Sequence, residues 1–225
     1  MADTLPISLS PLKTRHKIRI WFTCLGFRYF TGFVKFWYGL SMMLTRHRKA
    51  TLPEFLTTQQ IAEMLRFGDG WRSDPFGGAL DVLTHPTRIQ WRLDNGKRKV
   101  EDCDGHAAYW CVALLKSGLA KRVWFSMYQM RKIDGRFGGH AVCVYEDQFG
   151  RLWWCDYGAP RMLEADLPIK ALDGWEWAIT SARGYKATPI AAAKLEVKLS
   201  KDKNGMRWAR GFQSKTDFPS WLSLR

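Results

Sequence analysis

Three side chains in the middle of this 225-residue chain could together perform nucleophilic chemistry: Cys103, His140 and Asp156. A cysteine attacks a carbonyl only as its thiolate, and a free thiol with a pKa of about 8.5 is mostly protonated at neutral pH. Two devices lower that pKa: the positive end of a helix and a histidine that takes the proton. A carboxylate then holds the imidazole in one orientation. These residue types, in this order, predict a Cys-His-Asp catalytic triad.

Cys103 stands where a polar segment gives way to an apolar helical pattern. Its neighbours are charged or small, in the sequence Glu-Asp-Cys-Asp-Gly-His-Ala over residues 101–107. A stripe at helical spacing follows, made of Ala107, Trp110, Cys111, Leu114 and Leu115. We therefore expect a helix over residues 104–119 with Cys103 at its positive end. His106, one turn after Cys103, is a rival for the role of base.

His140 and Asp156 fall on two strand-like segments, residues 139–146 and 151–156. The three residues between Asp147 and Arg151 suit a hairpin loop that ends with a left-handed Gly150. With that loop, His140 and Asp156 become diagonal neighbours on one face of the hairpin, within reach of each other. A loop of two or four residues would put them on opposite faces.

The remaining pattern predicts an α+β fold. A capped helix begins at Thr57, and residues 68–100 are rich in turn residues and read as loops. After the Cys103 helix, strand-like runs follow at 122–128, 139–146 and 151–156, with further ones at 175–180 and 194–199. A helix followed by consecutive strands indicates an antiparallel sheet.

The net charge of +14 is concentrated at the two ends of the chain. Residues 1–50 and 185–225 are strongly basic, whereas residues 51–184 are close to neutral. This pattern divides the chain into a basic, aromatic N-terminal extension, a central core and a basic C-terminal extension. Basic ends favour contact with nucleic acid, an acidic partner or an anionic membrane, and the alternative is that they are only solvated flanks.

Residues 18–44 are apolar and aromatic, but Arg28 and Lys35 interrupt them. Two basic residues make a membrane-spanning helix unfavourable, so we expect no transmembrane span. The first interpretation is an amphipathic helix that docks on the core or on a partner, and the second is a helix on a membrane surface. A helix packed in the protein's own core is the third.

The cysteines indicate neither disulfides nor metal. They are five in number and contain no Cys-x-x-Cys pair, which predicts a reduced, intracellular protein without a structural zinc site. Cys24, Cys111, Cys143 and Cys155 are interpreted as core residues. Nucleotide-binding glycine motifs are absent from the sequence, and we expect no cofactor.

The motifs around the three residues resemble those of the transglutaminase-like cysteine proteinases of bacteria and their phages. The similarity lies in Asp-Cys-Asp-Gly-His-Ala over 102–107, Gly-His-Ala-Val over 139–142 and Leu-Trp-Trp-Cys-Asp over 152–156. It implies a papain-like fold with Cys103 as nucleophile, His140 as base and then acid, and Asp156 as the group that orients it. Trp91 and Gln90 would support the oxyanion or the substrate.

Two positions depart from the pattern of that family. Glu101 stands where a glycine is expected, and Gly105-His106 replaces an acidic-aromatic pair. The Asp-Cys-x-Gly sequence is also similar to bacterial cell-wall endopeptidases of papain-like fold, whose third residue is normally histidine. Asp156 favours the first family.

The sequence therefore predicts cysteine-dependent acyl transfer on a peptide or amide, ending in hydrolysis or in transfer to an amine. The alternative is a non-enzymatic viral or phage module on the same fold that uses residues 1–50 and 185–225 to hold nucleic acid or a partner protein. The expected location is the cytoplasm, or the host cytoplasm or virion for a phage protein.

Overall fold

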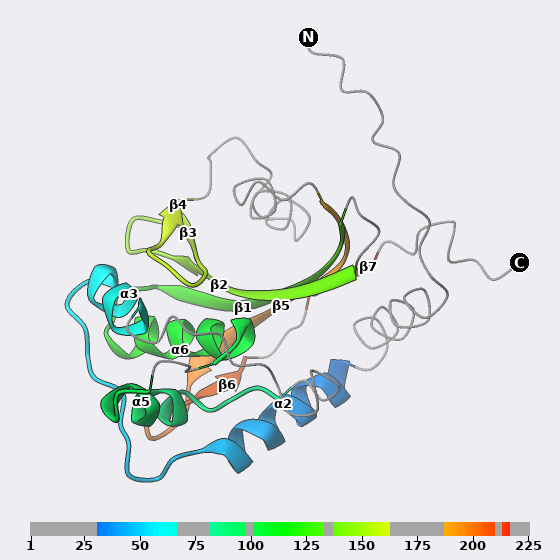
Figure 1. Ribbon diagram of the computed structural model, residues 1–225. Coiled ribbons are helices and arrows are strands. Elements are labelled where there is room, and N and C mark those ends of the chain that lie inside the picture. The colour runs from blue at the N-terminus through cyan, green and yellow to red at the C-terminus, as the bar shows by residue number, and fades with distance from the viewer. Residues whose placement is uncertain are drawn as a thin grey trace, which may run out of the picture.

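The computed structural model describes residues 31–66, 82–97, 101–132, 137–162, 187–209 and 213–216. They form an α+β structure in which helices pack against an antiparallel sheet (Figure 1). The described helices are α2 (Thr31–Thr45), α3 (Thr58–Arg66), α5 (Pro86–Asp94) and α6 (Cys103–Lys116). The described strands are β1 (Arg122–Lys132), β2 (Phe137–Glu146), β3 (Leu152–Cys155), β4 (Arg161–Met162), β5 (Ala187–Leu199), β6 (Met206–Trp208) and β7 (Gln213–Thr216).

The strands form one sheet in the order β4-β3-β2-β1-β5-β6, with β7 also paired to β5. Every pairing among the described strands is antiparallel. β1 lies in the middle and pairs along its length with β2 on one side and with β5 on the other. The predicted α+β class with an antiparallel sheet is confirmed.

Helix α6 lies in the centre of the molecule, against one face of the sheet (Figure 1). It is apolar on nearly all sides and buried from Asp104 to Leu114, as is typical of a helix enclosed by other elements. The sheet residues that share its core cluster alternate along each strand: Val123, Phe125 and Met127 on β1, and Ala141, Cys143 and Tyr145 on β2. The helix predicted over 104–119 is confirmed, with its start at Cys103.

The two short helices show one successful and one failed prediction. At α3, Thr57 Oγ1 accepts from the Gln60 N–H and Gln60 Oε1 accepts from the Thr57 N–H, which is the expected capping box. Helix α5, by contrast, lies inside the segment that we predicted as loops, and that prediction is wrong for residues 86–94. His85 caps this helix by accepting from the Thr87 N–H, and Pro86 occupies the first turn.

Helix α2 is docked on the rest of the protein through one of its faces. Tyr38 and Met42 are buried in the core cluster, and the Trp208 Nε1–H donates to the Lys35 carbonyl at 3.2 Å. The Tyr38 ring also meets the Phe125 ring edge-on at 6.2 Å. This agrees with the first interpretation of the segment, of which residues 18–30 lie outside the described residues. None of the described helices combines the length and apolar character needed to cross a membrane.

The basic C-terminal segment supplies strands to the sheet. β5 pairs with β1 from Val197 to Ala187 and lies between β1 and β6. The boundary that we drew from charge at residues 184 and 185 therefore does not coincide with an edge of the sheet. The strand predicted at 194–199 is longer than expected, and the one predicted at 175–180 lies outside the described residues.

Candidate active site

Cys103 is the first residue of α6 and is half-buried. The preceding residue, Asp102, has extended backbone angles (φ −91°, ψ −162°) and is the N-cap of the helix. A helix start carries about half a positive charge and presents backbone N–H groups that have no partner within the helix. This position therefore favours a negatively charged sulfur and an oxyanion beside it.

The β2–β3 hairpin has the loop predicted from the sequence. The Asp147 N–H donates to the Arg151 carbonyl at 2.9 Å, and Gly150 has the left-handed φ of +79°. Glu146 pairs with Leu152 and Cys143 with Cys155, which is the register that a three-residue loop produces. The predicted three-residue loop and its register are confirmed.

Asp147 holds this loop in place. Its carboxylate accepts from the backbone N–H groups of Phe149 and Arg151 and from the side chains of Arg151 and Trp153, at 2.7–2.9 Å. Partial burial acts to raise the pKa of Asp147, but these four bonds outweigh it and lower the pKa to about 2. The loop that sets the hairpin register is therefore anchored by an ionised carboxylate.

The structure brings His140 and Asp156 together. The His140 Nε2 lies 2.8 Å from Asp156 Oδ1, and the two side chains are only 8% and 17% exposed. A carboxylate in this position fixes the orientation of the imidazole and favours the tautomer with the proton on Nε2. Nδ1 is then the nitrogen suited to accept a proton.

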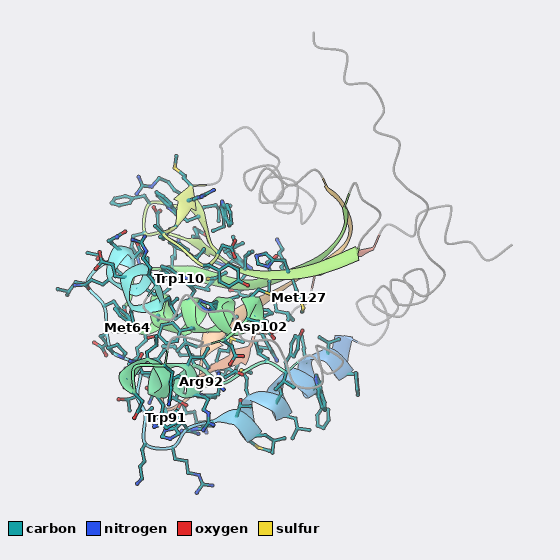
Figure 2. All side chains as sticks on the ribbon, in the orientation of Figure 1. Met64, Trp91, Arg92, Asp102, Trp110 and Met127 are labelled. Atoms are coloured by element: carbon teal, nitrogen blue, oxygen red, sulfur yellow. The ribbon has the colours of Figure 1, made fainter. Side chains whose placement is uncertain are left out.

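Helix α6 contacts the bend that carries Asp156. The Trp110 Nε1–H donates to the Asp156 carbonyl at 3.1 Å, and the His106 ring packs edge-on against the Tyr157 ring at 5.0 Å. Figure 2 shows Trp110 between α6 and the sheet and Asp102 at the start of the helix. Cys103, His106 and Trp110 are three and four residues apart, so they share one side of α6. The thiol therefore lies on the side of the helix that meets the Asp156–Tyr157 bend.

The imidazole belongs to the other face of the sheet. Ala141, Cys143 and Tyr145 pack in the core cluster with α6, whereas Val142 and Val144 are buried outside that cluster. Because side chains alternate along a strand, His140 shares the face of Val142, away from α6. The register supports the prediction that His140, Val142 and Asp156 share one face of the hairpin. Helix α6, however, packs on the opposite face of the sheet.

Tyr157 links the two sides at the edge of β2. Pairing of β2 with β3 ends at Cys143 and Cys155 in the described residues, and the chain bends at 156–159. The Tyr157 ring contacts the His106 ring on one side and the His140 ring, at 5.8 Å, on the other. The helix start and the His140–Asp156 pair therefore approach each other around this edge.

His106 has a different environment from His140. It is buried, and its Nδ1 has no hydrogen-bond partner among the described residues. Burial lowers the pKa of His106 to about 4, although the carboxylates of Asp102 and Asp156 act to raise it. His106 is therefore a neutral imidazole at pH 7, and the carboxylate hydrogen bond expected of a catalytic base is made by His140.

The two departures from the family pattern fit each other. A Cβ added at Gly105 would lie 1.9 Å from Cγ of Glu101, so a side chain at 105 would force this glutamate side chain to move. Glu101 is buried and accepts from the Arg92 guanidinium at 2.5 Å. Burial raises the pKa of Glu101, whereas the Arg92 charge and a hydrogen bond from Thr84 act to lower it. Glu101 and Gly105 are thus closely packed at the start of α6, and the Glu101–Arg92 pair joins this start to α5.

Gln90 and Trp91 make their described contacts elsewhere. The Gln90 amide donates to Asp94 at 2.7 Å and accepts from the Tyr109 hydroxyl, which joins α5 to the middle of α6. Trp91 stacks on His47 at 4.9 Å, on the side of α5 away from α6 (Figure 2). Support of an oxyanion by either residue stays a prediction.

Sequence reasoning missed Tyr157 and the role of Trp110. Tyr157 follows Asp156 in a run that reads as a turn, and Trp110 reads as one member of an apolar stripe. The described residues hold no group of three His, Cys, Asp or Glu side chains arranged to bind a metal ion. The chain matches no protein-family model and no curated protein, so its function is inferred from its own residues.

Proposed function

We propose that this protein is a cysteine-dependent enzyme of papain-like fold that transfers the acyl group of a peptide or other amide. One observation carries the proposal. Asp156, which is hydrogen-bonded to His140 of β2, stands on a bend whose backbone is held by Trp110 of α6, the same helix that begins at Cys103. The nucleophile, the base and the orienting carboxylate are thereby tied to one structural unit.

The reaction begins when Nδ1 of His140 takes the proton of the Cys103 thiol. The sulfur attacks the carbonyl carbon of the amide, and backbone N–H groups at the start of α6 stabilise the oxyanion. The C–N bond then breaks as the amine takes the proton from His140, which leaves a thioester on Cys103. Water attacks this thioester to give an acid, or a second amine attacks it to give a new amide, and the thiol regains its proton.

Two residues near the thiol, Tyr157 and Asp102, would contact a bound substrate. Tyr157 is partly exposed and touches both histidines, so its ring is placed to contact a bound substrate. Asp102 is buried beside Cys103, and its Oδ1 has no hydrogen-bond partner in the described part of the chain. Buried polar atoms of this kind are costly, and they are often retained where a ligand will satisfy them.

The test is covalent labelling of the Cys103 thiol with a library of electrophilic amide probes, read by mass spectrometry in a Cys24→Ser background. We expect adducts on Cys103 and none on Cys111, Cys143 or Cys155, because these three are fully buried and burial raises the pKa of each thiol. Cys103→Ala should abolish the adducts and Cys111→Ala should not. Adducts spread equally over the cysteines would contradict the proposal.

A second candidate is favoured by the charge distribution. The basic ends suit a module that holds nucleic acid or an acidic partner and has no catalytic role. Nucleic-acid binding of this kind weakens steeply with added salt, because neutralised phosphates release their counterions. Tight, salt-sensitive binding together with an unreactive Cys103 would favour this candidate over the enzyme.

A further inference from the structure

Helix α2 is apolar on two opposite sides. One side, which includes Tyr38 and Met42, is buried in the core of the protein. The other side carries four large apolar residues in contact with solvent: Phe33 and Phe36, each 63% exposed, Met43, 65% exposed, and Leu44, 73% exposed. With 3.6 residues per turn these positions fall within one stripe along the helix. Exposed apolar stripes of this kind are typical of surfaces that bind another protein or a membrane.

The charged residues of the chain segment that carries this stripe are all basic, and Asp202 pairs with Arg46 just after the helix. The chain has no aspartate or glutamate between Asp3 and Glu54, a segment that contains the whole of α2. Arg48 and Lys49 follow the helix directly and are exposed. An apolar stripe on a segment with an excess of cations matches a surface that is apolar in depth and negatively charged on the outside.

The same charges disfavour a second copy of the chain as the partner. Two α2 faces in contact would bring together segments that are basic and without acids, in a protein of net charge +14. Like charges brought close repel, and this opposes association at low salt. Figure 1 shows α2 along the lower edge of the described structure, and its Tyr38 side packs on Phe125 of β1, so the opposite side of the helix faces outward. An extended flat surface can therefore reach the stripe.

We propose that the exposed face of α2 binds the surface of an anionic lipid bilayer. The helix lies in the plane of the membrane, with Phe33, Phe36, Met43 and Leu44 among the acyl chains and the basic residues near the headgroups. At 15 residues, α2 is too short to span a bilayer. This inference does not depend on the catalytic proposal, because none of the three proposed catalytic residues, Cys103, His140 and Asp156, belongs to α2.

The experiment is co-sedimentation of the full chain with vesicles of pure phosphatidylcholine and with vesicles that contain one third phosphatidylglycerol. We expect binding to the anionic vesicles at least tenfold tighter than to the neutral ones, and a loss of that difference in high salt. The paired variant Phe33→Ser/Phe36→Ser should weaken binding at least tenfold. Equal binding to both kinds of vesicle, or an unchanged paired variant, would overturn the proposal.

Phe149→Ser is the matched control. Phe149 is 82% exposed, at the tip of the β2–β3 hairpin, so the same exchange there should leave vesicle binding unchanged. Met43→Ser/Leu44→Ser repeats the test two turns later if the first pair lowers the melting temperature. Concentration-dependent self-association that disappears in Phe33→Ser/Phe36→Ser, without vesicle binding by the parent chain, would assign the face to a protein contact and refute the lipid proposal.

Discussion

The candidate site has two sides that are built differently. On the hairpin side, formed by β2, β3 and their loop, the acidic groups have partners: Asp156 is bonded to His140, and Asp147 accepts four hydrogen bonds. On the helix side, formed by residues 101–106, Asp102 Oδ1 and His106 Nδ1 are buried without a partner among the described residues. Each such atom costs about 1–3 kcal/mol. The hydrogen bonds of the hairpin side thus fix the orientation of the His140 imidazole. On the helix side, the unpartnered polar atoms are ones that a ligand of the proposed enzyme would satisfy.

The largest expected effect is a loss of kcat/KM on changing Asp156, the carboxylate of the hairpin side that is bonded to His140. Asp156→Asn should lower kcat/KM about 10²–10⁴-fold, because an amide no longer favours the imidazole tautomer that accepts the thiol proton. The measurement is the turnover of an amide found with the probe library. Asp147→Asn makes the same exchange in the same hairpin, away from the imidazole, and should leave kcat/KM of the folded protein nearly unchanged. Equal losses in both variants would remove the distinction between the two carboxylates.

The buried ion pair of the helix side should matter most for stability. Arg92→Met leaves Glu101 buried without its cation and should cost about 3–5 kcal/mol in the free energy of unfolding. Burial raises the folded-state pKa of Glu101, so the folded variant binds the proton more tightly than the unfolded chain does. The cost is therefore largest at high pH, where Glu101 is ionised, and should shrink as the pH falls and Glu101 becomes neutral.

Urea unfolding at pH 7 and at pH 5 measures this effect. Arg122→Met is the control, because Arg122 pairs with Glu196 at 3.0 Å on the surface, with 49% and 29% of the side chains exposed. Exposed pairs contribute about 0–1 kcal/mol. A loss at Arg92 no greater than that at Arg122 would show that the start of α6 is not held by this pair.

The contact between Glu101 and Gly105 predicts a coupled effect. Gly105→Ala should destabilise the protein by about 1–3 kcal/mol, because the new methyl group overlaps the glutamate side chain. Gly39→Ala in α2 is the control, since an added Cβ there meets nothing within 4 Å. There the exchange should be neutral or stabilising by up to about 1 kcal/mol.

A double-mutant cycle separates this overlap from other effects. In a Glu101→Gly background the cost of Gly105→Ala should fall to near zero, because the overlapping side chain is gone. The measurement is the free energy of unfolding of the four proteins. Strict additivity of the two changes in unfolding free energy would refute the coupling between Glu101 and Gly105.

The smallest effect concerns the loop of the hairpin side. The folded-state pKa of Asp147 is about 2, below its ordinary value, so its contribution to stability is complete above about pH 4 and is lost as the pH falls toward 2. Asp147→Asn should cost about 1–2 kcal/mol at pH 7 and less at pH 2. Thermal melts across this range check the prediction, and a cost that stays constant with pH would contradict it.

Local chemistry made parts of this fold predictable. Gly150 and a three-residue loop were enough to predict the register that brings His140 beside Asp156. The capping box at Thr57 and the polar start of α6 were also readable from neighbouring residues. Helix α5 was missed because His85-Pro86 is as compatible with a turn as with a cap followed by proline in the first turn of a helix.

Other features depend on contacts between distant residues. β2 is apolar on both faces, since Val142 and Val144 are buried as fully as Cys143, so its pattern could not show which face α6 covers. The fit of Glu101 against Gly105 likewise appears only once the start of α6 is folded. The charge pattern could not reveal that β5 enters the sheet, because the pairing partner of this strand, β1, lies more than fifty residues earlier in the chain.

The central claim is that the thiol at the start of α6 and the imidazole on the hairpin act together around Tyr157. The most direct test is the rate of iodoacetamide alkylation of Cys103 between pH 5 and pH 9, in the parent chain and in His140→Asn. We predict that the parent reacts at least tenfold faster than free cysteine at pH 6 and that His140→Asn loses most of this advantage, keeping only the part due to the helix start. Identical profiles for the two proteins would contradict the claim.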